Sequence, residues 1–429
     1  MRRKRRLWWM GIILLVSMVS TAYGAEVAEY KTFPRTETIS HEIVSVGGDQ
    51  TSVCVTWFSE SNQPQLLFVT PAAEEDVPSH ASRLCLVEPR ESVYQKLWRF
   101  SAQVSGLTSG AEYQYCIAAL GQIGHWSAQG QFRFTPEQCR EFLLFGDPQL
   151  GGSRDRERDQ KGFQRTLSAA KEAAPNASFA LFMGDLKQTK VLDHREGIKE
   201  ARKEFSAFKK AVKTLEIPAA IVCGNHDVLE DDRAFLDEFA APVGQWQTEN
   251  DEDYSFQAGQ TLFLVLNSNR NDPWEHVDFL YDAVEQHPDA LWRVVVMHHT
   301  LYPMSSDKDK KELSSLKKRL TAVCCELGVQ VVFSAHNHFY ARTNPLNEEG
   351  QASDHGPVYL CLNSSSGSIY LDPWKKALPE KSGVVEVLRQ DNRPNYTRCR
   401  VDEHSFRMET FDAETGEVVD AVELNREQE

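Results

Sequence analysis

The chain has 429 residues and carries 62 Asp and Glu against 47 Lys and Arg, for a formal net charge of −15. Such an acidic surface repels polyanions, so extended binding to nucleic acid or to an anionic membrane is disfavoured; a small anionic substrate is still compatible where metal ions reverse the local charge. The length and the 41% hydrophobic content suffice for two or three domains with cores of their own.

Residues 1–24 have the pattern of a secretory signal peptide. A basic run at residues 2–6 precedes an apolar stretch at residues 7–19, and the small residues Ala22 and Gly24 follow, with cleavage expected after Gly24. The apolar stretch is shorter than the roughly 20 residues that a membrane-spanning helix needs, and an uncleaved anchor is the alternative. Cleavage leaves 42 Lys and Arg against 62 Asp and Glu, a net charge of −20. We therefore expect a secreted, periplasmic or cell-surface protein without stable membrane insertion.

Residues 31–136 contain short segments of alternating polar and apolar residues, separated by polar turns. The clearest segments are residues 52–58, 65–69, 98–104 and 113–117. Period-two alternation at this spacing predicts a small all-β sandwich. The polar turn at residues 135–137 is the expected hinge into a second domain over residues 140–425.

In the second domain, apolar strand-like runs alternate with helical patterns. Apolar residues recur at three- and four-residue steps over residues 197–215, 274–286 and 310–327. This alternation predicts an α/β fold with a layered core. A second sheet closing over the core is expected from the strands near the end of the chain, at residues 383–388, 396–401, 405–411 and 417–424.

Five apolar runs in this domain each end abruptly in an acidic, amide or histidine side chain. They are residues 142–145 before Gly146 and Asp147, 179–183 before Gly184 and Asp185, 220–223 before Gly224, Asn225, His226 and Asp227, 294–297 before His298 and His299, and 329–333 before the segment that holds His336 and His338. Runs this short and rich in β-branched and aromatic residues indicate buried strands. Because functional groups gather where the strands of an open α/β sheet end, these side chains should share one crevice. An Asp after a strand-ending glycine is often only a helix N-cap, but that explanation does not account for six candidates on five strand ends.

Carboxylates, an amide and imidazoles are the donors that a site for two divalent metal ions needs. Asp147 and Asp185 are the strongest pair, because a carboxylate shared between two cations offsets their mutual repulsion. Asn225 would supply a neutral oxygen ligand. Imidazole ligands would come from His298, His336 and His338.

The series of motifs resembles that of the calcineurin-like metallophosphoesterase superfamily, which runs D-x-[HG], G-D, G-N-H-[DE], a lone His and G-H-x-H. The surrounding residues resemble the purple acid phosphatase branch in the apolar approach at 292–298, the strand pair at 253–256 and 262–268, and the terminal segment at 415–420. Residues 40–136 are similar to the fibronectin type III-like N-terminal domain of that branch. The resemblance implies a four-layer α/β/β/α sandwich, preceded by the small all-β sandwich, that hydrolyses phosphoric esters.

The same resemblance implies two divalent or trivalent metal ions, drawn from Fe, Mn, Zn or Mg, with Asp185 as the bridging ligand. The ligands implied for the first ion are Asp147 and His338, and those for the second are Asn225, His298 and His336. His226 would act as general acid for the leaving oxygen, and Asp227 would orient its ring. A metal-bridging hydroxide would attack a small phosphorylated substrate, in the leading interpretation a phosphomonoester.

Three positions depart from the pattern of the family. Gln149 stands where the superfamily has His or Gly, and it is a candidate ligand of the first ion because an amide oxygen binds hard cations, though more weakly than imidazole. Gln188 stands where purple acid phosphatases carry a metal-bound tyrosine, so neither the purple colour nor a tyrosinate-bound ferric ion is expected. Ala335 replaces the first glycine of G-H-x-H. The sequence from Asp147 to Gln149 also resembles a D-P-Q subgroup that includes serine/threonine-directed phosphoesterases.

Two further residues are candidate substrate contacts. His299 adjoins a ligand and Arg342 follows the last motif, and a structural role is equally compatible with each. The charged run at residues 153–161 is interpreted as a solvated face.

Two rival functions stay open at this point. The same site could serve a phosphodiesterase or nucleotide hydrolase, or the chain could be a non-catalytic exported binding module with a degenerate metal site, which Gln149 and Gln188 would favour. The sequence leaves open the disulfide pairing of the nine cysteines and the oligomeric state.

Overall fold

The computed structural model describes residues 39–72, 82–92, 96–120, 126–190, 195–228, 233–240, 242, 253–373 and 383–426. The predicted signal peptide, residues 1–24, lies outside these residues. Among the described helices, none is long and apolar enough to cross a membrane. All nine cysteines lie in the described part, and no disulfide joins any of them.

The N-terminal domain consists of two small antiparallel sheets that pack face to face. One sheet contains β1 (Ile39–Val46), β2 (Val53–Ser59), β6 (Trp98–Val104) and β5 (Arg90–Glu91), and the other contains β4 (Arg83–Val87), β3 (Gln65–Pro71), β7 (Ala111–Ala119) and β8 (Ala128–Phe134). Aromatic side chains fill the space between them, where Trp57 stacks on Phe100 with ring centroids 5.5 Å apart. The expected all-β domain is therefore confirmed.

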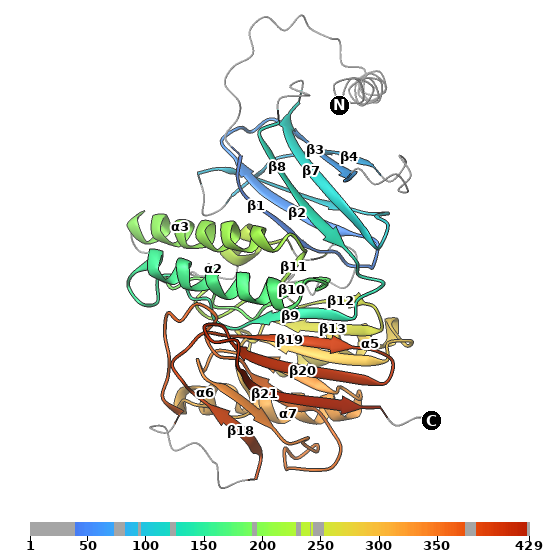
Figure 1. Ribbon diagram of the computed structural model, residues 1–429, viewed down its shortest axis with the longest axis vertical. Helices are drawn as coiled ribbons and strands as arrows, with labels where there is room; N and C mark the ends of the chain where they lie inside the picture. The colour runs from blue at the N-terminus through green and yellow to red at the C-terminus, as the bar shows by residue number, and fades with distance from the viewer. Residues whose placement is uncertain are drawn as a thin grey trace, which may run out of the picture. The chain divides into compact units, whose positions relative to one another are not determined.

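Two larger sheets form the second domain (Figure 1). The first contains the parallel strands β9 (Glu141–Phe145), β10 (Ala180–Phe182) and β11 (Ala219–Ile221), extended by β19 (Asn395–Val401), β20 (Ser405–Asp412) and β21 (Val418–Asn425). The second contains β12 (Tyr254–Ala258), β13 (Thr261–Leu266), β14 (Trp292–Met297), β15 (Val331–Ser334), β17 (Val358–Cys361), β16 (Tyr340–Thr343) and β18 (Val385–Arg389). We expected the C-terminal strands to form a second sheet together, and this expectation is wrong. β19, β20 and β21 extend the first sheet, and β18 belongs to the second. β19 pairs antiparallel with β9, and the apolar face of the β19–β20 hairpin extends the core of the first sheet.

Helices cover the outer face of each sheet and complete four layers. α2 (Arg156–Ala173) and α3 (Arg195–Val212) pack on the first sheet, and α5 (Pro273–Gln286) and α7 (Ser314–Glu326) pack on the second. Short helices are α4 (Arg233–Glu238), α6 (Asp307–Glu312) and a 3₁₀ turn at Lys213–Leu215. Alternation along β9 places Phe142 and Leu144 between the sheets, and Leu143 and Phe145 beneath the helices. The expected α/β/β/α order is confirmed.

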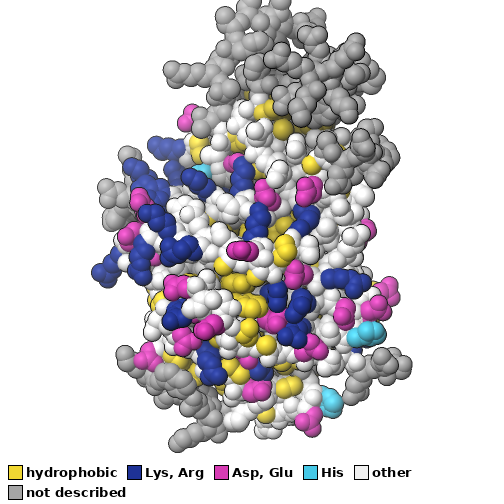
Figure 2. All heavy atoms as spheres, viewed as in Figure 1, with side chains coloured by type: hydrophobic (Ala, Val, Ile, Leu, Met, Phe, Trp, Pro, Cys, Tyr) yellow, Lys and Arg dark blue, Asp and Glu magenta, His cyan; other side chains and the backbone are white. Residues whose placement is uncertain are grey.

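The charged run at residues 153–161 is not simply a solvated face, because it begins α2. Asp155 caps this helix by accepting a hydrogen bond from the Arg158 backbone N at 3.0 Å. Phe163 and Leu167 then bury one face of the helix at a four-residue step. Figure 2 shows basic side chains gathered over α2 and α3, so the acidic excess is not spread evenly over the surface.

Direct contacts join the N-terminal domain to the second domain. β1 pairs in parallel with β11 at Ser45 and Ala219, which makes one continuous ten-stranded sheet. The ammonium of Lys209 on α3 is buried, lies 2.7 Å from Glu238 Oε2 and stands 4.9 Å from the ring centroid of Phe58 in β2. A buried cation held in this way fixes α3 against the N-terminal sheet.

A buried pair of a histidine and an aspartate supports the second sheet and makes folding stability depend on pH. His276 Nδ1 lies 2.5 Å from Asp253 Oδ2, and His276 Nε2 lies 3.1 Å from the Arg270 carbonyl oxygen. Burial alone would lower the pKa of His276, but the hydrogen bond and charge of Asp253 outweigh it and raise the pKa above 6.5. The pKa of His276 in the unfolded chain is about 6.5, so the stabilisation by this pair is complete below about pH 6.5. It is lost as the pH rises through the pKa of the folded state.

The variant His276→Gln should keep a neutral hydrogen bond and lose only the charge-dependent part of this stability. We expect it to unfold with a free energy about 1 kcal/mol below that of the wild type at pH 5.5, and with a smaller difference at pH 9. Urea unfolding followed by tryptophan fluorescence measures both values, with the exposed His355→Gln as control. An equal deficit at both pH values would contradict the assignment.

Candidate metal centre

The polar side chains that follow the five strand ends lie together in the structure. Asp185, His298 and His336 form one group of potential metal ligands, and Asp147, Asp185 and His338 form another, with ligand atoms within 4.8 Å of one another in each group. Asp185 belongs to both groups. The parallel register of β9 with β10 and of β14 with β15 brings these strand ends to the same edges of the two sheets.

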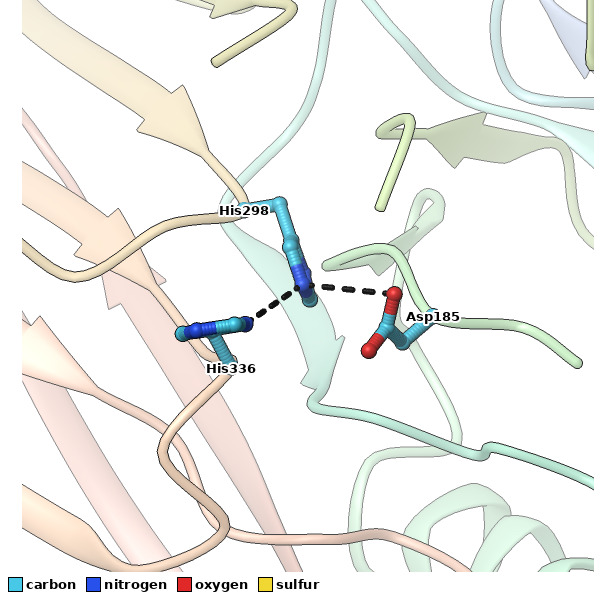
Figure 3. A group of neighbouring side chains, drawn as sticks. All are labelled: Asp185, His298 and His336. Carbon is cyan, nitrogen blue, oxygen red and sulfur yellow. Dashed lines mark hydrogen bonds and ion pairs between the residues drawn. The ribbon is translucent and has the colours of Figure 1, made fainter. Parts of the chain in front are cut away.

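The donors of the group around His298 converge on one point (Figure 3). His298 Nε2 lies 3.3 Å from Asp185 Oδ1, 3.1 Å from Asn225 Oδ1 and 3.2 Å from His336 Nδ1. Two imidazole nitrogens, an amide oxygen and a carboxylate oxygen facing one another form the donor set of a divalent cation. These four residues therefore fit the second ion that the family resemblance implies.

The group around Asp147 is buried and rich in oxygen. Burial raises the pKa of Asp147 well above its usual range and Asp185 adds to this, while His298 opposes it. The side-chain Oε1 atoms of Gln149 and Gln188 are also buried, and neither has a hydrogen-bond partner in the described part of the chain. Repelling carboxylates together with an orphaned amide oxygen at Gln149 fit a cation held by Asp147, Asp185 and His338.

Two glycines allow the ligand loops to pack this closely. A Cβ atom on Gly184, where φ is +84°, would lie 2.7 Å from the Gly224 backbone N and 2.8 Å from His298 Nδ1. A Cβ atom on Gly224 would lie 2.0 Å from the Asp185 backbone N. Four of the candidate ligands also have positive φ values, although none of them is a glycine: Asp147, Asp185, His336 and His338. Strained backbone of this kind is typical of functional sites.

Main-chain carbonyl groups orient two of the candidate histidine ligands. His298 Nδ1 lies 2.8 Å from the Met183 carbonyl oxygen, and His338 Nδ1 lies 3.1 Å from the Ile369 carbonyl oxygen. Because a carbonyl only accepts, each Nδ1 carries the proton and Nε2 is left for a metal. Burial lowers the pKa of His338 to about 4, which keeps this ring neutral at physiological pH.

His226 lies beside the two groups, but Asp227 does not orient its ring as expected. His226 Nε2 is 4.0 Å from Asp185 Oδ2, and His226 Nδ1 is 2.8 Å from the Gln188 carbonyl oxygen. The oxygens of Asp227 instead accept hydrogen bonds from the backbone N atoms of Leu186 and Gly224, each at 2.8 Å. Asp227 therefore ties together the loops after β10 and β11, and Gln188 holds the imidazole.

A buried lysine that the sequence analysis did not identify also joins the loops after β10 and β11. Lys187 Nζ donates to the carbonyl oxygens of Thr189, at 2.6 Å, and of His226. Its only sequence signal is a lysine two positions after the ligand Asp185, which by itself is compatible with a surface residue.

The two candidate substrate contacts have different positions. His299 lines a groove of about 540 Å³ beside the metal centre, together with Asn225, Ser268 and His336, and its Nδ1 lies 2.9 Å from Ser268 Oγ. Arg342 is instead a structural residue. It is buried on β16, and its guanidinium binds Asp420, with Nε 2.6 Å from Oδ2, and Glu386. These two carboxylates, distant in sequence, neutralise the charge of Arg342, so the structure favours the structural role over the substrate contact.

The motifs match known families over most of the described chain. Residues 141–340 match the family model of the calcineurin-like phosphoesterases, and residues 40–134 match that of the purple acid phosphatase N-terminal domain. A serine/threonine-protein phosphatase, CPPED1 of Pongo abelii, is 26% identical over 226 residues, which cover 46% of this chain and 68% of the relative. Purple acid phosphatase 23 of Arabidopsis thaliana is 23% identical over 158 residues, 35% of this chain and 34% of the plant protein.

Solved structures show the same fold at low sequence identity. A purple acid phosphatase, PPD1 from seeds of yellow lupin (Lupinus luteus), superposes with a TM-score of 0.71 at 15% identity, covering 91% of this chain and 75% of the lupin chain. PhoD superposes with a TM-score of 0.59 at 12% identity, covering 92% and 90%. The chain is a member of the calcineurin-like phosphoesterase family with a purple acid phosphatase N-terminal domain, and is thus a metal-dependent phosphoric ester hydrolase.

Proposed function

We propose that this protein is an exported phosphomonoesterase that works with two metal ions. The observation that carries the proposal is the position of Asp185, which belongs to both ligand groups and so can lie between two cations. Asp147 and His338, with Gln149 beside them, would hold one ion. The residues that would hold the other are Asn225, His298 and His336. Export rests on the signal-peptide pattern of residues 1–24.

The bound ions would supply positive charge against the phosphoryl oxygens and lower the pKa of the attacking water. The protein's own part is to fix their ligands in a buried, strained loop cluster and to provide a proton donor. His226 would take this role, which is supported by the Gln188 carbonyl at its Nδ1 and by the position of its Nε2, 4.0 Å from Asp185 Oδ2. Burial lowers the pKa of His226 to about 4, against the opposing effect of Asp185, so proton donation is favoured in acidic solution.

The groove beside His299 is large enough for the alcohol part of a small phosphorylated substrate. Most of the residues that line it have polar side chains, among them Ser268, Asn271 and Asp309. Amide and hydroxyl groups suit a polar leaving group. The overall negative charge argues against nucleic acid as a substrate.

A phosphoserine or phosphothreonine side chain is the second candidate substrate. The 26% identity to a protein named as a serine/threonine-protein phosphatase favours it, as does the D-P-Q form of the first motif. A phosphoprotein is also a monoester, so the site chemistry is the same and only the leaving group differs.

Parallel hydrolysis assays test the proposed function. Protein purified without chelator should contain metal by elemental analysis. It should also hydrolyse p-nitrophenyl phosphate faster than bis-p-nitrophenyl phosphate, with a phosphoserine peptide assayed beside them. Chelation should abolish turnover, and Mn²⁺, Zn²⁺ or Mg²⁺ should restore it. Preference for the diester would support the phosphodiesterase alternative, and metal-loaded protein without turnover on any ester would support the binding-module alternative.

A further inference from the structure

The three histidines of the metal centre differ in what holds the ring nitrogen that faces away from the metal. Main-chain carbonyls of Met183 and Ile369 hold His298 and His338. His336 instead presents Nδ1 to the ligand group and has Nε2 3.4 Å from Asp309 Oδ2. His298 Nδ1 also lies 3.9 Å from Asp147 Oδ1, but that carboxylate belongs to a ligand group itself. Among these three described histidines, His336 is therefore the one whose outward nitrogen faces a carboxylate outside both ligand groups and not a main-chain carbonyl.

Asp309 lies on α6, which is fastened to the loop that carries His336. The Asp309 backbone N donates to Ser306 Oγ at 3.0 Å, which caps the helix. Asn337, the neighbour of His336, donates from Nδ2 to the Pro303 carbonyl oxygen at 2.8 Å and accepts from Ser305 Oγ at 2.5 Å. Through Asn337 the strand-end loop and the segment that enters α6 are thus tied together, which keeps Asp309 within reach of Nε2.

Asp309 is not part of either group of potential metal ligands. Its carboxylate lies on the outer side of His336, against the groove that also contains His299. A carboxylate in this position accepts a hydrogen bond from Nε2–H. It thereby keeps the proton on Nε2, leaves Nδ1 unprotonated and raises the basicity of the ring as a ligand.

We propose that Asp309 is a positioning residue that fixes the tautomer and orientation of His336, and so sets the affinity of the second ion. The inference rests on the proposed dinuclear centre. It makes α6 part of the support of one ion only, because the ligands of the first ion are held by β9, β10 and the Ile369 carbonyl. Loss of the Asp309 carboxylate should therefore affect the two ions unequally.

The test is a metal titration of the full chain carrying Asp309→Ala or Asp309→Asn. Cobalt(II) titration, followed by visible absorption and by calorimetry, should resolve two binding events in the wild type. We expect Asp309→Ala to weaken one event by about 10- to 100-fold and to change its absorption spectrum, with the other event unchanged. Asp309→Asn keeps an oxygen acceptor and should restore part of the affinity. Lys311→Ala, on the exposed side of the same helix, is the control for helix integrity.

The proposal would be overturned if Asp309→Ala bound both cobalt ions with the affinities of the wild type and with an unchanged spectrum. It would also be overturned if both binding events were weakened equally. Far-UV circular dichroism of the metal-free variant excludes general unfolding as the cause of a loss. If the wild type binds two ions but hydrolyses no phosphoester, the proposed function fails while the role of Asp309 can still be measured. If the wild type binds no ion, both proposals fail together.

Discussion

Replacing Asp185 by asparagine should abolish metal binding and hydrolysis together. Asp185 is buried, belongs to both ligand groups, and is the carboxylate nearest to His298 Nε2 and His226 Nε2. Asparagine has the same shape and can still accept the hydrogen bond from the His226 backbone N, so the fold should persist. It loses the negative charge that offsets two cations. We expect kcat/KM to fall by on the order of 10³-fold or more, the upper end of the effect of a single electrostatic contact.

Elemental analysis and steady-state kinetics on the same preparation measure this result. Asp155→Asn is a matched control, because it makes the same substitution at the cap of α2, where asparagine caps a helix as well as aspartate does. Asp147→Asn should lose one ion and keep the other, since Asp147 belongs to one group only. Full metal content with wild-type turnover in Asp185→Asn would refute the bridging role.

Removing the imidazole of His226 should slow turnover without removing the metals. A positioned general acid contributes about 10²- to 10⁴-fold. The loss in His226→Ala should be of this size for an alkyl phosphate, whose alkoxide leaves only after gaining a proton. It should be much smaller for p-nitrophenyl phosphate, whose phenolate leaves without one. The backbone contact to Asp185 survives in the variant, so the ligand geometry should stay intact.

The measurement is kcat for both esters, read beside the metal content, with the exposed His355→Ala as control. An equal loss for both esters would show that His226 binds the phosphoryl group and does not protonate the leaving oxygen. Loss of metal would assign His226 a role in holding Asp185.

Local pattern was sufficient to predict the strands, the all-β N-terminal part and the α/β core, because strand and helix periodicities depend on neighbouring residues. The order of the four layers came only from the resemblance to a known family. The exceptions are informative. α2 was missed because its first turn is highly charged, and its buried face only becomes regular from Phe163 onward. The C-terminal strands were identified as strands, but their sheet was not, since the pairing of Thr397 with Leu144 joins segments about 250 residues apart.

The sequence by itself determined which side chains end the strands at the metal centre. Strand ends of parallel sheets meet at one edge whatever the details of packing, so Asp147, Asp185, Asn225 and the motif histidines could be named in advance. Only the tertiary structure decided what holds them. Met183 reaches His298 from another strand, Asp309 reaches His336 from a helix, and Asp420 withdraws Arg342 from any substrate. These partners are selected by distance in space, and no periodicity or local motif encodes that distance.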